Sequence, residues 1–149
     1  MRRLKARMES ERLPRGADPS HHLKLGRGGL SDVEWVVQIL QLNHAHRYPR
    51  MRTTETLAAL QVAVNEELVE SADGQILADA WRTATGIRNA ITLVTGRSSN
   101  VLPSDPRVVA GVAHVLGYPV ADRGLLMEDY LRVSRRARNV MERLFYGWE

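Results

Sequence analysis

The 149-residue chain contains no cysteine, which excludes disulfide bonds, thiolate metal sites and cysteine nucleophiles. It also lacks a long hydrophobic run, because its uncharged apolar stretches fall far short of the roughly 20 residues that span a bilayer. The basic N-terminus is not followed by the apolar stretch of a signal peptide. We therefore expect a cytoplasmic protein with no membrane partner.

Signals for β-strands are missing as well, because no alternating apolar and polar run is bounded by hairpin dipeptides. Apolar residues recur instead three and four positions apart, which is the spacing of one helix face. This spacing predicts helices over residues 4–11, 32–46, 54–70, 75–95, 106–116 and 124–146, with 71–74 as a break. The pattern indicates an all-α fold, an antiparallel helical bundle of five to six helices.

Glycine, proline and aspartate mark several of the expected helix ends. Gly96 follows a periodic apolar segment and suits a helix C-terminus. Asp105 and Pro106 fit the N-cap and the first position of the next helix, and Gly117 fits its end. Gly86 lies inside a predicted helix, where glycine is unfavourable, so we expect a close helix crossing there.

The last predicted helix carries a narrow apolar seam with positions alternately four and three residues apart: Leu126, Tyr130, Val133, Ala137, Val140 and Leu144. Such a seam is typical of a helix that packs against another along its length. Its arginines lie mostly off the seam: Arg132, Arg135, Arg136, Arg138 and Arg143. We interpret them as a solvated face, with a phosphate-binding surface as the alternative.

The net charge of +4 resides in the first part of the chain. Residues 1–16 hold six basic and two acidic side chains, whereas the remainder holds equal numbers of each. A basic arm on a neutral body is a weak signal for nucleic acid, and no groove-reading motif or aromatic stacking platform accompanies it. We expect no nucleic-acid partner, and interpret the arm as a solvated helix or as one that packs against an acidic neighbour.

The stretch KLGRGGLSDVEWVVQ, residues 24–38, precedes and begins the second predicted helix. Ser31 and Glu34 have the spacing of a capping box, in which each side chain satisfies a backbone N–H of the other. Asp32 suits the positive end of the helix dipole. Asp32 and Glu34 could also form a magnesium pair. We favour capping for Glu34 and leave both roles open for Asp32.

Three glycines precede this helix start. Gly26, Gly28 and Gly29 allow a positive φ or a close backbone approach, and Lys24 and Arg27 lie beside them. An anion could bind at such a helix N-terminus. The phosphate-binding P-loop and the dinucleotide fingerprint do not fit, because their further required residues are absent. A structural turn and a ligand-facing loop both remain open.

The histidines give no metal signal of their own. His44 and His46 are two positions apart, a spacing that does not place them on one helix face, and His21 and His22 are adjacent in a loop. The usual helical zinc pair is four positions apart. We therefore predict no metal site in this chain.

Longer segments resemble a known family. They are ERLPRGADPSHHLKLGRGGLSDVEWVVQ, TLAAL, LPSDPR, LGY and DYLRVSRRARNVMERLFYG. Together these resemble the C-terminal helical part of glutamine-synthetase adenylyltransferases, the bifunctional adenylyl-transferring and adenylyl-removing enzymes of bacterial nitrogen control, in their actinobacterial form. The pattern K-x-G-x-G-G-[LI]-x-D-[VI]-E is the most specific part. A related pattern opens the helical domain of PII uridylyltransferase, but Glu34-Trp35 and the arginine-rich ending favour the adenylyltransferase.

The resemblance implies a parent enzyme that moves AMP from ATP to a tyrosine of glutamine synthetase and removes it by phosphorolysis. ATP and Mg²⁺ would serve the parent's nucleotidyltransferase head, and none would be expected on this chain. Glutamine synthetase, the PII signal protein, glutamine as effector and the chain's own nucleotidyltransferase domain would be the partners. The family's head carries a Gly-Ser motif and paired aspartates that bind two Mg²⁺ ions.

This chain contains neither a Gly-Ser dipeptide nor an Asp-x-Asp motif. We therefore expect a fragment that is inactive alone, holds no catalytic residue and supports or regulates the head. Residues 1–16 would be a basic connecting helix from the missing head, and 17–149 the helical bundle. The residues expected to face the head's active site are Lys24, Gly26, Arg27, Gly28, Gly29 and Asp32. Gly28→Ala or Lys24→Ala should then lower adenylylation and leave the chain folded.

Two other functions remain open. The chain could be a free-standing interaction module that binds a protein partner through its arginine-rich last helix. It could also be the equivalent domain of PII uridylyltransferase.

Overall fold

The computed structural model describes residues 1–119 and 123–147. The described residues form six α-helices and two short 3-10 helices: α1 (Arg2–Arg12), η1 (Pro19–His21), α2 (Leu30–His44), η2 (Pro49–Met51), α3 (Thr56–Asn65), α4 (Ser71–Thr95), α5 (Pro106–Val115) and α6 (Arg123–Tyr146). They contain no strand, only an isolated bridge between His22 and Val101. The prediction of an all-α bundle is confirmed.

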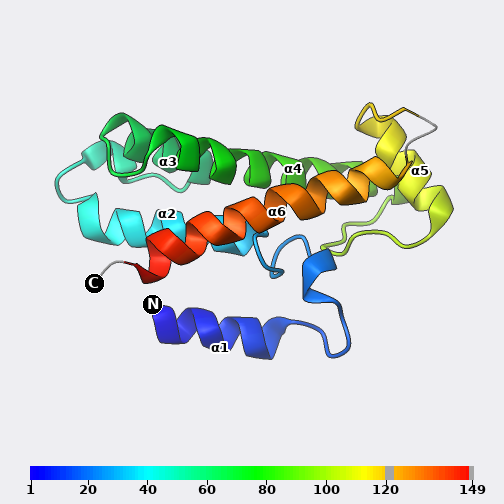
Figure 1. Cartoon of the computed structure of the whole chain (residues 1–149), viewed down its shortest axis with the longest axis horizontal. Helices are drawn as coiled ribbons and strands as arrows, with labels where there is room; N and C mark the ends of the chain where they lie inside the picture. Colours follow the sequence, from blue (N-terminus) through cyan, green and yellow to red (C-terminus); the bar gives the residue numbers. More distant parts are fainter. Residues whose placement is uncertain (120–122, 148–149) are drawn as a thin grey trace.

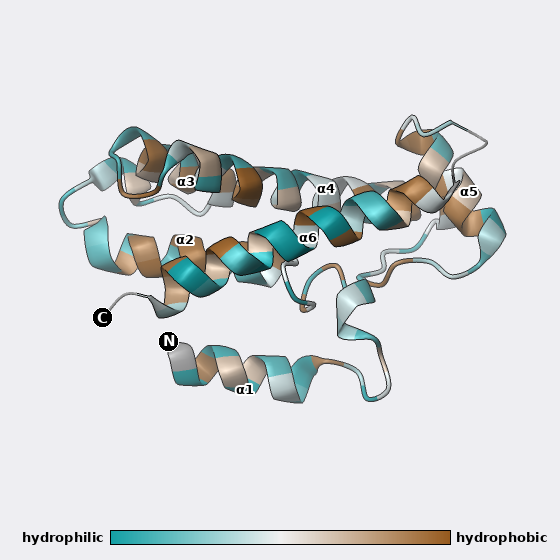
Figure 2. Cartoon of the chain, viewed as in Figure 1, coloured by the Kyte–Doolittle hydropathy of each residue, from teal (hydrophilic) through white to brown (hydrophobic). Residues whose placement is uncertain are grey.

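The two longest helices run alongside each other in opposite directions (Figure 1). α6 packs on both α4 and α2, while α3 packs on α2 and α4. α5 covers the end of the bundle where α4 finishes and α6 begins (Figure 1). α1 lies below these helices in the view of Figure 1. Polar residues occupy most of the visible face of α6, as expected for a helix with one face in the core (Figure 2).

One part of the core fills the space between α2, α3, the first half of α4 and the second half of α6. Val36, Leu40, Leu60 and Leu77 are buried there with Phe145. The rings of Trp35 and Phe145 meet edge to face with centroids 6.2 Å apart, a favourable arrangement for two aromatic rings. This cluster holds α2 against the C-terminal half of α6.

A second part of the core lies toward α5. Leu23 and Leu30 are buried there with Ile87 of α4, Val112 of α5 and Tyr130 of α6. The side chain of Trp81 packs against both parts, so the two clusters meet at the middle of α4. Leu23 and Leu30 flank the glycine-rich segment, whose position is therefore fixed by burial at both ends.

Most of the predicted helix ends are confirmed. Gly96 follows α4 with φ 70°, the left-handed conformation of a C-terminal glycine. The carboxylate of Asp105 accepts a hydrogen bond from the N–H of Arg107, as an N-cap does. Gly117 also has a positive φ of 81° and follows α5 closely. Local backbone chemistry thus sets these ends.

Two sequence predictions about glycines are wrong. Residues 71–74, predicted as the break between two helices, are the first turn of α4, and the break lies at residues 66–70 instead. A Cβ on Gly74 would collide with the side chain of Val64, so α3 and α4 approach closely there. A Cβ on Gly86 would meet only ordinary contact with Leu116, at 3.7 Å. The close crossing predicted at Gly86 therefore lies at Gly74.

Within residues 1–119 and 123–147, no helix combines the length and the apolar character that crossing a membrane requires.

Candidate functional site

The segment that leads into α2, residues 22–29, is called the glycine loop. Its backbone is closed by its own hydrogen bonds, because Gly26 N–H donates to the carbonyl of His22 and Gly29 N–H donates to that of Gly26, each at 2.9 Å. The imidazole Nδ1 of His22 accepts the N–H of Leu25 at 2.9 Å. Burial lowers the pKa of His22, which keeps this nitrogen free to accept. The loop is therefore a tightly bonded turn.

The glycines of this loop lie inside the molecule. Gly28 has φ 73°, and a Cβ there would collide with the backbone carbonyl of Ser134 in α6. A Cβ on Gly26 would collide with the carbonyls of Pro19 and His22. The predicted close backbone approach is thus real, and the neighbour in the described structure is the chain itself rather than a ligand.

The predicted capping box of Ser31 and Glu34 is wrong. α2 begins at Leu30 with Gly29 as its N-cap, and no side chain caps it. Backbone carbonyls of the glycine loop accept the first N–H groups of α2 instead. Leu30 N–H donates to Leu23 O at 3.0 Å, and Ser31 N–H donates to Lys24 O at 2.9 Å. Because carbonyls already satisfy these first donors, the helix start needs no side-chain cap.

Asp32 is buried and its carboxylate is surrounded by donors. Its Oδ2 accepts the N–H of Gly28 at 2.7 Å and lies 3.2 Å from Nη1 of Arg138. Its Oδ1 lies 2.8 Å from Nζ of Lys5, whose side chain is fully buried. No group of three or more His, Cys, Asp or Glu residues in the described parts of the chain is placed to hold a metal ion. Asp32 thus joins the glycine loop to α1 and α6.

The charges around Asp32 form a larger set, which we call the ion cluster: Lys5, Glu9, Asp32, Arg138 and Glu142. Glu9 pairs with Lys5 and, at 3.1 Å, with Arg138 Nη1. Arg138 Nε pairs with Glu142 at 2.7 Å. Burial alone would raise the pKa of Glu9, but Lys5 and Arg138 outweigh it and the pKa is lowered. Burial would lower the pKa of Arg138, but the adjacent carboxylates raise it. Both shifts favour the charged forms of Glu9 and Arg138.

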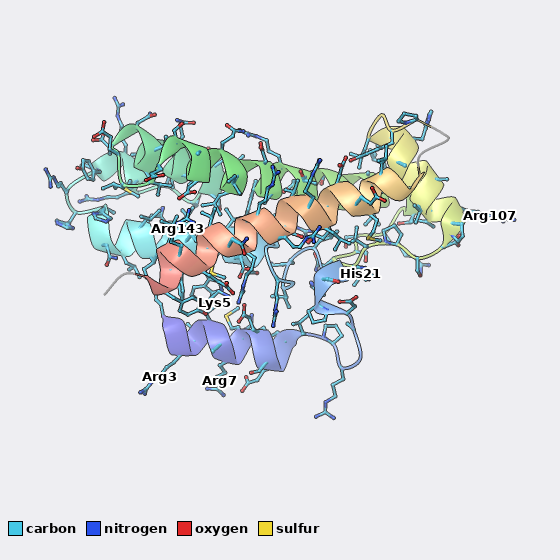
Figure 3. All side chains as sticks on the ribbon, in the orientation of Figure 1. Arg3, Lys5, Arg7, His21, Arg107 and Arg143 are labelled. Carbon is cyan, nitrogen blue, oxygen red and sulfur yellow. The ribbon has the colours of Figure 1, made fainter. Side chains whose placement is uncertain are left out.

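Sequence reasoning missed Lys5 and Arg138. Figure 3 shows Lys5 extending from α1 toward the bundle, whereas Arg3 and Arg7 extend away from it. Among the basic side chains of residues 1–16 whose burial is described, Lys5 faces inward and the others are exposed to solvent. The sequence signal was the four-residue spacing of Lys5 from Glu9 and of Arg138 from Glu142.

A second ion pair fixes the far end of α6. Nη2 of Arg143 donates to both carboxylate oxygens of Asp73 at 2.6 Å. The hydrogen bond raises the pKa of Arg143. Asp73 lies in the first turn of α4, so this pair joins the C-terminal turns of α6 to the N-terminus of α4.

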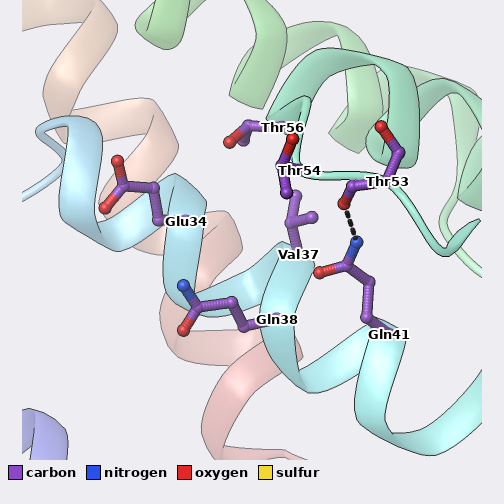
Figure 4. Close-up of a pocket in the computed structure, with 7 residues that line it drawn as sticks. All are labelled: Glu34, Val37, Gln38, Gln41, Thr53, Thr54 and Thr56. Atoms are coloured by element: carbon purple, nitrogen blue, oxygen red, sulfur yellow. Dashed lines mark hydrogen bonds between the residues drawn. The ribbon is translucent and has the colours of Figure 1, made fainter.

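A polar hollow of about 330 Å³ opens between α2 and the segment before α3 (Figure 4). It is lined by Glu34, Val37, Gln38, Gln41, Thr53, Thr54 and Thr56. Nε2 of Gln41 donates to the carbonyls of Met51 and Thr53 at 2.7 and 2.8 Å, which fixes the segment against α2. The carboxylate of Glu34 has no hydrogen-bond or ionic partner among the described residues. Glu34 therefore lines this hollow instead of capping the helix.

Comparison with known proteins matches this chain to a family model described as GlnD PII-uridylyltransferase, over residues 2–145. The chain is 54% identical over 147 residues to a bifunctional glutamine synthetase adenylyltransferase/adenylyl-removing enzyme of Streptomyces avermitilis. It is 54% identical to the protein of that name from Leifsonia xyli and 49% identical to that from Mycolicibacterium smegmatis. Each match covers 99% of this chain, which spans about 15% of the relative's length.

Proposed function

Because this chain belongs to the family described as GlnD PII-uridylyltransferase, we propose that it is a helical, non-catalytic domain of a glutamine-synthetase adenylyltransferase. The observation that carries this proposal is the similarity to the bifunctional enzymes over 99% of the chain, including the glycine loop. The parent enzyme would transfer AMP from ATP to a tyrosine of glutamine synthetase and remove it by phosphorolysis. It would act in the cytoplasm.

In this proposal, the reacting groups belong to a nucleotidyltransferase head outside this chain. ATP and Mg²⁺ would bind to that head, and glutamine synthetase would be its protein substrate. PII and glutamine would regulate the balance of the two reactions. The helical domain would hold the head in place and transmit the regulatory state to it.

The ion cluster supports a structural role for residues 1–16 as the connection to the head. Lys5 fixes α1 to Asp32, and Asp32 binds the backbone of Gly28. A helix that enters from a preceding domain would therefore be fastened directly to the glycine loop. We propose that Lys24 and Arg27 extend from this loop toward the head. The glycines and Asp32 would then position these two side chains rather than contact nucleotide.

Lys24 offers the cleanest test, because its side chain is half-buried and has no hydrogen bond or ion pair among the described residues. In the full-length enzyme, Lys24→Ala should lower the rate of AMP transfer to glutamine synthetase at least several-fold, and the melting temperature of this chain should not change. Arg107→Ala, an exposed change on α5, is the matched control. A Lys24→Ala enzyme with the wild-type rate would exclude a role for Lys24 at the head.

Calorimetric titration of this chain with ATP-Mg, glutamine, PII and glutamine synthetase would show which partner contacts it directly. A heat of binding from glutamine or PII would place regulation on this domain. If none of the four binds, the domain would act by bracing the head alone.

A second candidate follows from the description of the matching family model, which names PII uridylyltransferase. The full-length enzyme would then transfer UMP to PII. Incubating it with labelled UTP and PII in one reaction, and with labelled ATP and glutamine synthetase in another, separates the two candidates by the protein that becomes labelled.

A further inference from the structure

A hollow of about 220 Å³ lies between the glycine loop and α6. Its lining comes from three places in the chain: Ser20 of η1, Arg27 of the loop, and Leu131, Ser134, Arg135, Arg138 and Asn139 of α6. The α6 residues recur three and four positions apart and therefore share one helix face. Three arginines thus line one small hollow, although Arg27 and Arg138 are far apart in sequence.

No aspartate or glutamate lines this hollow. A neighbouring hollow of about 320 Å³ shares Arg27 and Arg138 but also includes Glu9, so acidic groups lie on that side of Arg138. Asp18, two positions before Ser20, accepts hydrogen bonds from the N–H and hydroxyl of Ser20. The lining itself therefore contains cationic and neutral polar groups around the aliphatic floor of Leu131.

The three arginines differ in how many of their guanidinium N–H groups have no partner among the described residues. Arg27 is exposed and forms no ion pair or hydrogen bond with any described residue. Arg135 uses only Nε, which donates to the carbonyl of Leu131 at 3.1 Å, so both of its Nη atoms remain available. Arg138 is held by Glu9, Asp32 and Glu142 through Nη1 and Nε, which leaves Nη2. The excess positive charge therefore comes from Arg27 and Arg135.

We propose that this hollow binds a phosphate group of a small molecule. Guanidinium groups donate several hydrogen bonds in a fixed planar geometry that matches phosphate oxygens. A phosphate offers enough oxygens to accept from Arg27 and Arg135 together, and the side-chain amide of Asn139 supplies a neutral donor, whereas the hydroxyl of Ser134 already donates to the carbonyl of Leu131. Arg138 is already fixed by the ion cluster, so it needs little reordering when the anion binds.

The site goes beyond the proposed function, because it is a property of this chain without a catalytic head. Its occupant could be inorganic phosphate, pyrophosphate or the phosphate of a nucleotide, which share the recognised group. Each can be titrated separately into ¹⁵N-labelled chain at constant ionic strength, since screening alone alters weak anion binding. The signals to follow are the side-chain Nε–H resonances of the arginines.

Saturable shifts of the Arg27 and Arg135 signals with at least one of the three compounds are expected. The compound that binds most tightly identifies the source of the phosphate. Arg27→Ala and Arg135→Ala should each raise the dissociation constant about tenfold or more, the usual effect of losing a charge-assisted hydrogen bond. Both side chains are exposed, so both variants should keep the wild-type melting temperature.

Arg107→Ala serves as the control for loss of one exposed positive charge away from the hollow, and it should bind like wild type. The inference is overturned if none of the three compounds causes saturable shifts. It is also overturned if Arg27→Ala and Arg135→Ala bind as tightly as Arg107→Ala. A negative result here leaves the AMP-transfer assay of the full-length enzyme unaffected, so failure of this site and failure of the proposed function are distinguishable.

Discussion

Nζ of Lys5 lies 2.8 Å from Oδ1 of Asp32, and the two side chains are 0% and 4% exposed. One group belongs to the first helix of the chain and the other to the start of the second. A buried pair of this kind adds little by its presence compared with apolar residues, but removal of one partner leaves the other charge buried without full compensation. Its main effect is to fix where α1 sits.

Lys5→Ala is therefore expected to lower the free energy of unfolding by about 3 kcal/mol, the typical cost of breaking a buried ion pair. Asp32 would keep Arg138 and the N–H of Gly28 but lose its nearest cation. Urea denaturation followed by circular dichroism measures the change.

Arg7→Ala provides the control for this prediction, because Arg7 pairs with Glu11 on the same helix at 2.9 Å with both side chains exposed. Exposed pairs of this type contribute about 0–1 kcal/mol. Equal losses in Lys5→Ala and Arg7→Ala would contradict a special role for the buried pair.

Gly28→Ala should destabilise the chain more than Gly96→Ala. Both glycines have similar positive φ values, 73° and 70°, so alanine is strained by about 1–2 kcal/mol at either position. Only at Gly28 would the new Cβ collide with a backbone carbonyl, that of Ser134; nothing lies within 4 Å at Gly96. Thermal unfolding of both variants separates the collision from the strain.

This comparison also revises the expectation that Gly28→Ala leaves the chain folded as in wild type. A fall in enzyme activity with that variant would report displaced α6 packing as well as any change at the head. If Gly28→Ala and Gly96→Ala unfold at the same temperature, the glycine loop is less firmly seated on α6 than the geometry indicates.

His22 should make the chain less stable as the pH falls. Burial lowers the pKa of His22 below its ordinary value of 6.5. The unfolded chain therefore binds this proton more readily, so the stabilisation is present above about pH 6.5 and is lost as the pH falls through the lower pKa of the folded state. The free energy of unfolding measured from pH 7.5 to 5.5 should decrease accordingly.

His22→Asn should remove this dependence, since the Asn side-chain oxygen can still accept the N–H of Leu25. His114→Asn, at an exposed position on α5, is the control and should keep the slope. The lowered pKa of Glu9 predicts a separate loss of stability below about pH 4.5, which His22→Asn should not affect. If the free energy of unfolding of His22→Asn still falls between pH 7.5 and 5.5, a group other than His22 causes the pH dependence.

Gln41→Ala should lower the free energy of unfolding by about 1–3 kcal/mol, since it removes the donor to the carbonyl of Thr53 and one of the two donors to that of Met51, which keeps the N–H of Thr53. Gln38 lines the same hollow but is exposed and bonds to no described residue (Figure 4). Gln38→Ala should therefore change the stability little. Similar losses in the two variants would show that the segment before α3 does not depend on this anchor.

The helices were predictable from sequence because their evidence is local. Gly96 and Asp105 mark helix ends through contacts within a few residues, and the buried Leu126, Ala137 and Val140 repeat along one face. The capping box failed although its residues have the right spacing, because carbonyls from the preceding loop had already taken the helix's first N–H groups.

The ion cluster was not predictable in the same way. Arg138 lies among several arginines on a charged helix, and its four-residue spacing from Glu142 does not by itself distinguish it from an exposed pair such as Arg7 and Glu11. Its partners Glu9 and Asp32 come from the other end of the chain. Such a contact depends on the tertiary arrangement, and so does the set of side chains that line the hollow with three arginines.

α6 contacts the backbone of the glycine loop partway along its length and forms an ion pair with α4 near its C-terminal end. The carbonyl of Ser134 occupies the space that a Cβ at Gly28 would need. Arg143, about two and a half turns farther along α6, pairs with Asp73. No flexible side chain lies between the carbonyl of Ser134 and Gly28, so the two backbones are in direct contact. Through α6, the glycine loop is therefore connected to the first turn of α4 at the opposite end of the bundle.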